Sequence, residues 1–395
     1  MPEKIHVLII PSWYPRFKGD VSGSFFREQA IALSKRNCCV GVIYPQFRSL
    51  KNLKGVFLEP YGLREELDDE LFTLRWHSVV FTPKMDEYNK KSWLNAGMKL
   101  FEHYVAIKGK PDIVHVHSML NGGFLANQIF EKYQIPYVIT EHNSMFFRDM
   151  VAKEKIKSLD EVVRNAGYCI SVSTEFKNKL NSIFNVNKWE YLPNIVNENF
   201  LKSKLQNNIE KGFFKYCSVC LLTKNKNVDL LIKAFSLVLK DFPESLLYIV
   251  GDGSERNHLI DLSKKLNLEK NIVFLGLLSR EDVLLTMNKV DTLIISSEFE
   301  TFGVVAIEAL ALGKPVVSTK CGGPENIVNT DVGYLVGKNS VESLKNGMLE
   351  VQKNYNKFSS REIRKYCLNN FGEEVVIENI KTIYKEVIEL KKSNG

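Results

Sequence analysis

The alternation of short apolar runs with amphipathic stretches is the feature that most limits what this chain can fold into. Runs typical of strands occupy residues 5–10, 39–44, 113–117, 137–140 and 169–172, and then 216–222, 246–251, 272–275, 292–296 and 315–318. Stretches with helical periodicity lie between them, among them 25–35, 93–108, 125–133, 228–239 and 256–266. A repeated β-α-β pattern predicts parallel sheets covered by helices on both faces.

The pattern is interrupted once, in a polar stretch rich in Asn and Lys near residues 193–212. We therefore predict an α/β protein with two doubly wound, Rossmann-like domains, residues 1–200 and 201–372, followed by a long amphipathic helix over 373–395. Ligands of such sheets bind outside the carboxyl ends of the strands. The expected ligand site is a central cleft that the two domains face.

Composition excludes several classes of function. The net charge of +7 on 395 residues is spread over both halves, and no nucleic-acid motif accompanies it, so a nucleic-acid partner is not expected. No run of 18 apolar residues predicts a transmembrane helix, and the first residues do not resemble a signal peptide. We expect a cytoplasmic protein whose seven cysteines are reduced.

Two carboxylates, Glu300 and Glu308, carry the strongest functional signal. Every residue from 304 to 312 except Glu308 is apolar, which predicts a buried helix with one costly carboxylate inside it. That helix contains no Lys, Arg or His, so the partner must come from elsewhere, and a ligand hydroxyl is a candidate. Helical rise separates the two residues by roughly 12 Å, so they suit two ends of one long ligand.

The residues between the two carboxylates suit an anion. Gly303 permits close approach of the backbone to a ligand, and the free N–H groups at a helix start, around Phe302 and Val304, attract negative charge. A nucleotide-sugar has this layout, with hydroxyls at both ends and a diphosphate in the middle.

This segment resembles the E-x7-E signature of retaining glycosyltransferases of the GT-B fold, family 4. Residues 322–328 resemble the family's G-G-x-x-E/N-hydrophobic element, and 333–336 match the strand that follows it. The resemblance implies that Glu300 holds hydroxyls of the donor sugar and Glu308 holds the ribose. It also implies that the C-terminal helix can pack back on the first domain.

The same resemblance assigns a catalytic role to two lysines. The family's G-R-L-x-x-x-K-G-x-D element aligns with residues 220–229, which keeps the lysine as Lys226 but has Leu221 at the arginine position. Both basic residues of the family clamp the donor diphosphate. Lys224 is a candidate to replace the missing arginine, and solvated loop lysines are the plain alternative.

Further donor contacts are expected from three loops. Gly23 precedes a helix after the first strand, where the family places a glycine loop against the diphosphate. Gly251 follows a strand in a Gly-Asp-Gly turn that by analogy walls the nucleotide site, and a turn former is the alternative. Arg280 closes a segment, 274–280, that resembles the one bordering the base.

Three residues at the ends of first-domain strands are the remaining candidates. By resemblance His117 lies near the reacting sugar carbon as a catalytic residue, whereas His142 and Asn143 face the acceptor. Ordinary polar residues at strand ends are the alternative. No third ligand is arranged for a metal, and Asp68-Asp69 is interpreted as an acidic segment with no strand before it, so neither metal nor cofactor is expected.

The resulting prediction is a retaining, metal-independent glycosyltransferase that moves a sugar, most simply from a UDP-sugar, to a glycan or lipid-linked glycan, in bacterial surface polysaccharide synthesis. Peripheral contact with the inner membrane face through residues 88–108 stays open, against an ordinary half-buried helix. Two other functions also stay open. A catalytically silent nucleotide-sugar-binding scaffold subunit would explain Leu221, and a GT-B-fold sugar-nucleotide epimerase would need no acceptor site.

Overall fold

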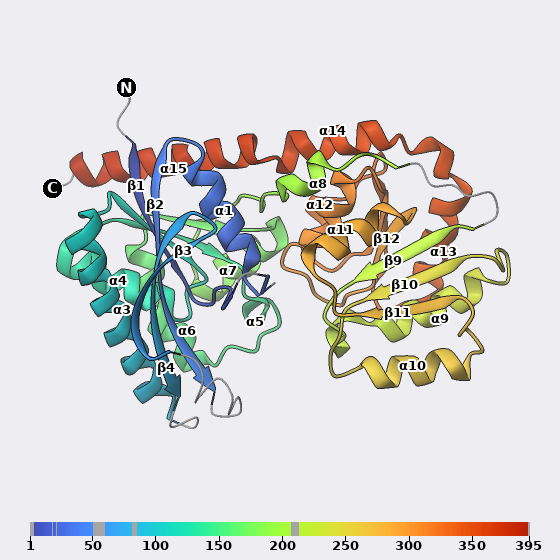
Figure 1. Cartoon of the computed structure of the whole chain (residues 1–395), viewed down its shortest axis with the longest axis horizontal. Coiled ribbons are helices and arrows are strands. Elements are labelled where there is room, and N and C mark those ends of the chain that lie inside the picture. The colour runs from blue at the N-terminus through green and yellow to red at the C-terminus, as the bar shows by residue number, and fades with distance from the viewer. Residues whose placement is uncertain are drawn as a thin grey trace. The chain divides into compact units, whose positions relative to one another are not determined.

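The structure is a computed structural model, which describes residues 4–17, 19–20, 22–49, 60–80, 85–206 and 213–393. It divides into two compact units. The first contains Met1–Val172, Lys177–Leu192 and Val376–Gly395, and the second contains Ser173–Phe176 and Pro193–Val375. Each unit is built on one mostly parallel sheet, which confirms the predicted α/β class with two doubly wound domains (Figure 1). Residues 207–212 of the expected linker and 394–395 of the expected last helix lie outside the described part.

The sheet of the first unit has the order β3-β4-β2-β1-β5-β6-β7-β8. Its strands are β1 (Ile5–Pro11), β2 (Cys38–Ser49), β3 (Gly62–Asp68), β4 (Leu71–Val80), β5 (Ile113–His117), β6 (Tyr137–Glu141), β7 (Tyr168–Ser171) and β8 (Trp189–Tyr191). All neighbours pair in parallel except β3 and β4. The central strands β5 and β6 are buried along their whole length, as continuous apolar runs predict.

The helices of the first unit include α3, α4 and α6, which contact one another in series. The described helices are α1 (Ser24–Ser34), α3 (Asp86–Lys108), α4 (Gly122–Tyr133), α5 (Ser144–Phe147), α6 (Lys153–Asn165), α7 (Thr174–Phe184) and most of α15 (Glu373–Ser393). Tyr384 of α15 hydrogen-bonds the ring of His115 on β5, with 2.6 Å between oxygen and nitrogen. Both residues are buried, so α15 contributes to the core of this unit.

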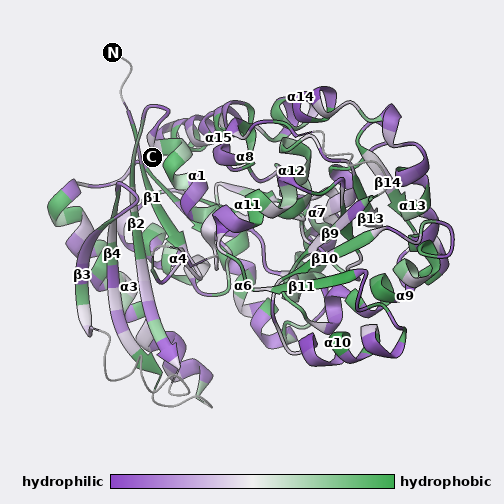
Figure 2. Cartoon of the chain, turned by 45° about the vertical axis from the view of Figure 1, so that its right-hand side comes forward, coloured by the Kyte–Doolittle hydropathy of each residue, from purple (hydrophilic) through white to green (hydrophobic). Residues whose placement is uncertain are grey.

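The second unit has a six-stranded, fully parallel sheet of order β11-β10-β9-β12-β13-β14. Its strands are β9 (Lys215–Val219), β10 (Leu246–Val250), β11 (Ile272–Gly276), β12 (Thr292–Ile295), β13 (Val316–Thr319) and β14 (Gly333–Val336). Its helices are α8 (Glu198–Lys202), α9 (Val228–Val238), α10 (Arg256–Lys265), α11 (Arg280–Asn288), α12 (Val304–Ala311), α13 (Val341–Lys353) and α14 (Ser360–Phe371), with short 3₁₀ turns η1 (Lys224–Lys226), η2 (Gly323–Asn326) and η3 (Tyr355–Lys357). Strands β10 and β11 are green in the hydropathy colouring, so apolar residues dominate both (Figure 2).

The interpretation of the segment before Asp68 was wrong. Strand β3 ends at Asp68, whose carboxylate lies 2.9 Å from the Arg27 guanidinium. Strands β3 and β4 were both missed. β3 is a charged edge strand without apolar alternation. The aspartate is therefore the partner of a buried arginine.

Helix α3 covers the segment 88–108 for which membrane contact was considered. Its side chains Leu100, Phe101 and Tyr104 are buried. In the described part of the chain, no helix combines the length and the apolar character needed to cross a membrane.

Candidate functional site

An ion pair between Lys226 and Glu300 forms the centre of the candidate site in the second unit. The Lys226 ammonium donates a hydrogen bond to Glu300 Oε1, and Ser297 Oγ donates to the same oxygen at 2.8 Å. Burial disfavours the charge on Lys226, but the attraction of Glu300 and its hydrogen bond outweigh burial and raise the lysine pKa. Lys226 therefore carries its positive charge at neutral pH.

The loop that carries Lys226 is fastened to the segment after β12. Asn225 Nδ2 donates to the carbonyl of Phe299 at 3.0 Å, and the Glu298 N–H donates to the Asn225 carbonyl at 2.8 Å. Ser296 Oγ donates to the Lys226 carbonyl at 2.7 Å. These bonds fix the backbone on both sides of the ion pair, so its geometry is set before any ligand arrives.

Helix α12 begins at Val304, four residues after Glu300, and Gly303 is its N-cap. Gly303 has a left-handed φ of 94°, which favours glycine, and the helix start leaves its first N–H groups without intrahelical acceptors. The Phe302 side chain is buried, and Val304 is half-buried. A Cβ on Gly323 would lie 2.2 Å from the Phe302 backbone, so the following glycine turn packs directly behind it. Phe302 can therefore offer a ligand its backbone but not its ring.

The second carboxylate of the motif, Glu308, is fully buried and has a protein partner. Arg280 Nη1 lies 2.5 Å from Glu308 Oε1, and the Arg280 guanidinium lies 5.4 Å from the centre of the Phe200 ring. The sequence suggested a ligand hydroxyl as the partner of this carboxylate, whereas the structure supplies a cation from the first position of α11. Arg280 and Glu308, both predicted as donor contacts, are thus brought together.

Gly251 has a structural reason to be glycine. Its φ is 131°, and a Cβ there would lie 1.8 Å from the carbonyl oxygen of Cys220. The Cys220 N–H in turn donates to the Val250 carbonyl at 3.0 Å. The turn after β10 therefore packs against the loop that leads to Lys226. That Gly251 also contacts the donor nucleotide-sugar stays a prediction.

Lys224 is not brought to the ion pair. It is exposed and lines a separate cavity of about 240 Å³ together with Asp229 and Glu255. Leu221, at the position where the family has arginine, is 63% exposed. That Lys224 takes over the role of the missing arginine stays a prediction.

In the first unit His117 and His142 are brought together at the ends of β5 and β6. Their rings are joined by a contact of 3.2 Å between Nδ1 of His117 and Nε2 of His142, and both rings pack against Phe26. Burial, reinforced by neighbouring histidines, lowers the pKa of His117 well below its usual value and that of His142 to about 3. Both imidazoles are therefore neutral, which suits hydrogen bonding to hydroxyls.

Asn143 and Gly23, two other predicted site residues, each stand at the start of a helix in the first unit. Asn143 Oδ1 accepts from the Met145 N–H at 2.9 Å as the N-cap of α5. Gly23 is the N-cap of α1 and has a φ of 73°. A Cβ added to Gly23 would lie only 3.0 Å from the Trp13 side chain. Their contacts with acceptor and donor stay predictions.

Sequence reasoning assigned no role to Glu141 or Ser297, which position the candidates. Glu141 is buried and accepts hydrogen bonds from the N–H groups of Met119, His142 and Asn143 at 2.9, 2.8 and 2.7 Å. Burial raises its pKa, and these hydrogen bonds oppose the rise. Glu141 is the last residue of β6 and Ser297 is the second residue after β12, so a polar residue at the carboxyl end of an apolar strand is the sequence signal that marks both.

The described residues contain no cluster of three His, Cys, Asp or Glu side chains that is suited to a metal ion. The carboxylates of the site are instead engaged by Lys226 and Arg280.

Comparison with known proteins defines the class. The family description Glycosyltransferase Family 4 matches residues 23–200, and Glycosyl transferases group 1 matches residues 199–367. The chain is a glycosyltransferase of the GT-B fold, and within that class it belongs to family 4.

Individual proteins agree with this assignment. N-acetyl-alpha-D-glucosaminyl L-malate synthase of Bacillus anthracis is 27% identical over 301 residues, which cover 72% of this chain and 77% of that protein. Sucrose-phosphate synthase from Thermosynechococcus elongatus has a TM-score of 0.79 at 17% identity and covers 98% of this chain and 100% of its own. HepE from Anabaena, in complex with UDP, has a TM-score of 0.74 at 17% identity and covers 96% and 99%. These structures show the shared fold.

Proposed function

We propose that this glycosyltransferase moves a sugar from a nucleotide-sugar, with UDP as the expected nucleotide, to a glycan or lipid-linked glycan with retention of configuration and without a metal. The observation that carries the proposal is the Lys226–Glu300 pair beside the open start of α12. It combines a cation and backbone N–H groups for a diphosphate with a carboxylate for sugar hydroxyls.

The proposed mechanism uses these groups in the order in which charge develops. As the bond between the anomeric carbon and the diphosphate breaks, Lys226 and the N–H groups around Gly303 and Val304 stabilise the leaving phosphate oxygens. Before this step, as the donor binds, Glu300 turns from Lys226 to hydroxyls of the donor sugar. The acceptor hydroxyl attacks from the face of the departing phosphate, whose oxygen takes the hydroxyl proton.

Glu308 is proposed to hold the ribose, which requires Arg280 to share or release that carboxylate. The exposed fraction of the Arg280 side chain, 30%, gives it one open side from which a nucleotide can approach. UDP is favoured because HepE, which shares the fold, was solved with UDP. Resemblance to the family, rather than a contact, supports a glycan or lipid-linked acceptor, a role in bacterial surface polysaccharide synthesis, and a cytoplasmic location with peripheral membrane contact.

Nucleotide binding tests the donor half of the proposal. In a thermal-shift panel of UDP, GDP, ADP and CMP, one nucleotide at 100 times its dissociation constant should add about 2.7 kcal/mol of stability. Glu308→Gln should reduce this shift, whereas the matched control Glu350→Gln, an exposed carboxylate on α13, should preserve it. Equal nucleotide affinity in wild type and Glu308→Gln would refute the ribose assignment.

Product analysis tests the chemistry. NMR of the product formed from a UDP-sugar should show the anomeric configuration of the donor, and EDTA should leave the rate unchanged. An inverted product would refute retention, and loss of activity on chelation that Mg²⁺ restores would refute metal independence.

A further inference from the structure

A cavity of about 610 Å³ in the first unit has a lining that includes none of the histidines described above. It opens where β1 and β2 end, between the first turns of α3, α4 and α6, and all of its lining residues belong to this unit. Its volume falls within the range of about 300–1,000 Å³ that is typical of small-molecule sites. Its place at the carboxyl ends of parallel strands is where α/β sheets bind ligands.

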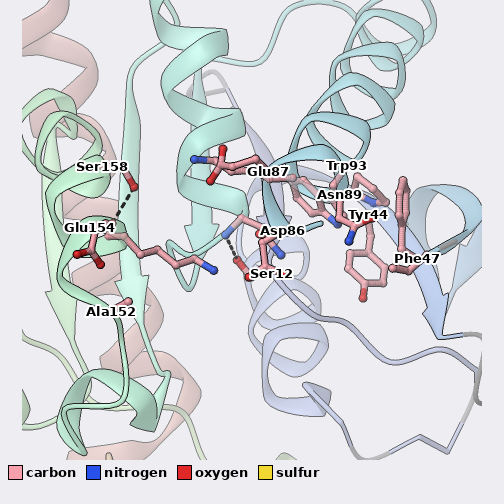
Figure 3. Close-up of a pocket in the computed structure, with 15 residues that line it drawn as sticks. Ser12, Tyr44, Phe47, Asp86, Glu87, Asn89, Trp93, Ala152, Glu154 and Ser158 are labelled. Atoms are coloured by element: carbon pink, nitrogen blue, oxygen red, sulfur yellow. Dashed lines mark hydrogen bonds between the residues drawn. The ribbon is translucent and has the colours of Figure 1, made fainter. Parts of the chain in front are cut away.

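One wall of the cavity is aromatic. Tyr44 and Phe47 from β2 and Trp93 from α3 gather on one side, and Glu154 and Ser158 from α6 lie on the opposite side (Figure 3). Tyr44 and Phe47 are half-buried, and Trp93 is buried. An aromatic surface facing a few polar groups suits a ligand that is flat and apolar on one face and rich in hydroxyls at its edges, such as a pyranose.

The polar side of the cavity is rich in hydrogen-bond acceptors. Asp86 and Glu87 stand in the first turn of α3, and Glu154 stands in the first turn of α6. The helix dipole favours ionised carboxylates at these positions. Ionised carboxylates accept hydrogen bonds and donate none, so they match sugar hydroxyls.

The same lining disfavours an anion. The N–H groups of Asn121 and Gly122, which begin α4 at the edge of the cavity, already donate to Ser12 Oγ at 3.2 and 3.0 Å. The Lys90 ammonium lies 3.5 Å from the centre of the Phe124 ring. Three carboxylates face two ammonium groups in the lining, so a phosphate or a uronate would enter against net negative charge.

We infer that this cavity binds a neutral glycosyl unit of the acceptor, with Trp93 and Tyr44 beneath the ring and Glu87 and Glu154 on its hydroxyls. The inference rests on the proposed transferase function and narrows the acceptor to a glycan whose bound unit carries no phosphate or carboxylate. A charged group of the acceptor would have to lie outside this cavity.

Saturation-transfer NMR tests the inference directly. The probes are the neutral disaccharides maltose, lactose and N,N′-diacetylchitobiose and, as anions, glucuronic acid and inorganic phosphate. At least one neutral disaccharide should give a saturable signal, which Glu154→Gln weakens by about fivefold, the effect of replacing one charge-assisted hydrogen bond with a neutral one. Glu161→Gln, an exposed carboxylate on the same helix outside the cavity, should leave binding unchanged.

Several outcomes would overturn the inference. These are tighter binding of glucuronic acid or phosphate, no saturable signal with any neutral disaccharide, or equal binding by wild type, Glu154→Gln and Trp93→Phe. A UDP titration of the same samples separates the two proposals. UDP binding without disaccharide binding overturns this inference alone, whereas disaccharide binding without binding of any nucleotide in the panel overturns the transferase proposal and the acceptor assignment with it.

Discussion

The buried pair of Arg280 and Glu308 makes the strongest quantitative prediction. Glu308 is fully buried and the Arg280 side chain is 30% exposed, with 2.5 Å between them. Removing one partner of a buried ion pair costs about 3–5 kcal/mol, because the other charge is left uncompensated. Since Arg280 is partly exposed, water can reach the space that it leaves, so Arg280→Met should cost about 3 kcal/mol, the lower end of that range.

A double-mutant cycle separates the interaction from other effects of truncation. The free energy of unfolding in urea, followed by circular dichroism, should be measured for wild type, Arg280→Met, Glu308→Gln and the double variant. The coupling energy should reach about 2 kcal/mol, within the range for contacting residues. Arg361→Met, an exposed arginine near the start of α14, is the control and should change stability by less than about 0.5 kcal/mol.

Two results would refute this reasoning. One is an Arg280→Met variant within about 1 kcal/mol of wild type, the median for an exposed pair. The other is a double variant whose loss equals the sum of the two single losses. Either result would mean that a group other than Arg280 compensates the charge of Glu308.

Four further predictions concern the site and its scaffold. Lys226→Met should lower kcat in steady-state kinetics by about 10²–10³-fold, as expected for loss of a group that stabilises developing charge. Leu221→Arg, which changes an exposed side chain, should raise the UDP affinity measured by calorimetry by about tenfold through one charge-assisted hydrogen bond. Gly251→Ala should destabilise the protein to thermal unfolding far more than Gly276→Ala, because only the first has a carbonyl 1.8 Å from the added Cβ, although both have positive φ; equal losses would contradict this. Burial lowers the pKa of His115 to about 3, so only the unfolded chain binds a proton there as the pH falls below about 6.5. This histidine should therefore reduce stability at pH 5 by about 2 kcal/mol relative to pH 8. In urea unfolding, His115→Gln should lose about 2 kcal/mol less than wild type over this range, whereas His117 and His142, whose pKa values are also lowered, keep their own contributions.

The fold was largely predictable because its central strands are buried on both faces. Strand β12 is four apolar or β-branched residues long and fully buried, and such runs are visible in any sequence. The charged edge strand β3 has no comparable pattern, because it is held by its backbone pairing with β4 and by ion pairs such as Asp68 with Arg27 rather than by apolar side chains.

The candidate site was predictable in its residue types but not in its pairings. The burial of Glu308 followed from the apolar residues around it, whereas its partnership with Arg280, 28 positions earlier, depends on where the fold places the first residue of α11. The bond from Ser297 to Glu300 and the three hydrogen bonds to Glu141 likewise depend on loop geometry. Sequence patterns report burial and local periodicity, and such long-range contacts lie beyond them.

The hydrogen bond between Tyr384 and His115 has a consequence for synthesis of the chain. Met1–Val172 and Lys177–Leu192 of the first unit emerge early from the ribosome, but the segment Val376–Gly395, which belongs to the same unit and carries Tyr384, emerges only after the second unit. Domains generally fold as units during synthesis, so the second unit can finish folding while the core of the first still lacks the buried side chains of α15, among them Ile380 and Tyr384. A nascent chain therefore presents an unfinished apolar surface to chaperones for as long as residues 193–375 take to be translated.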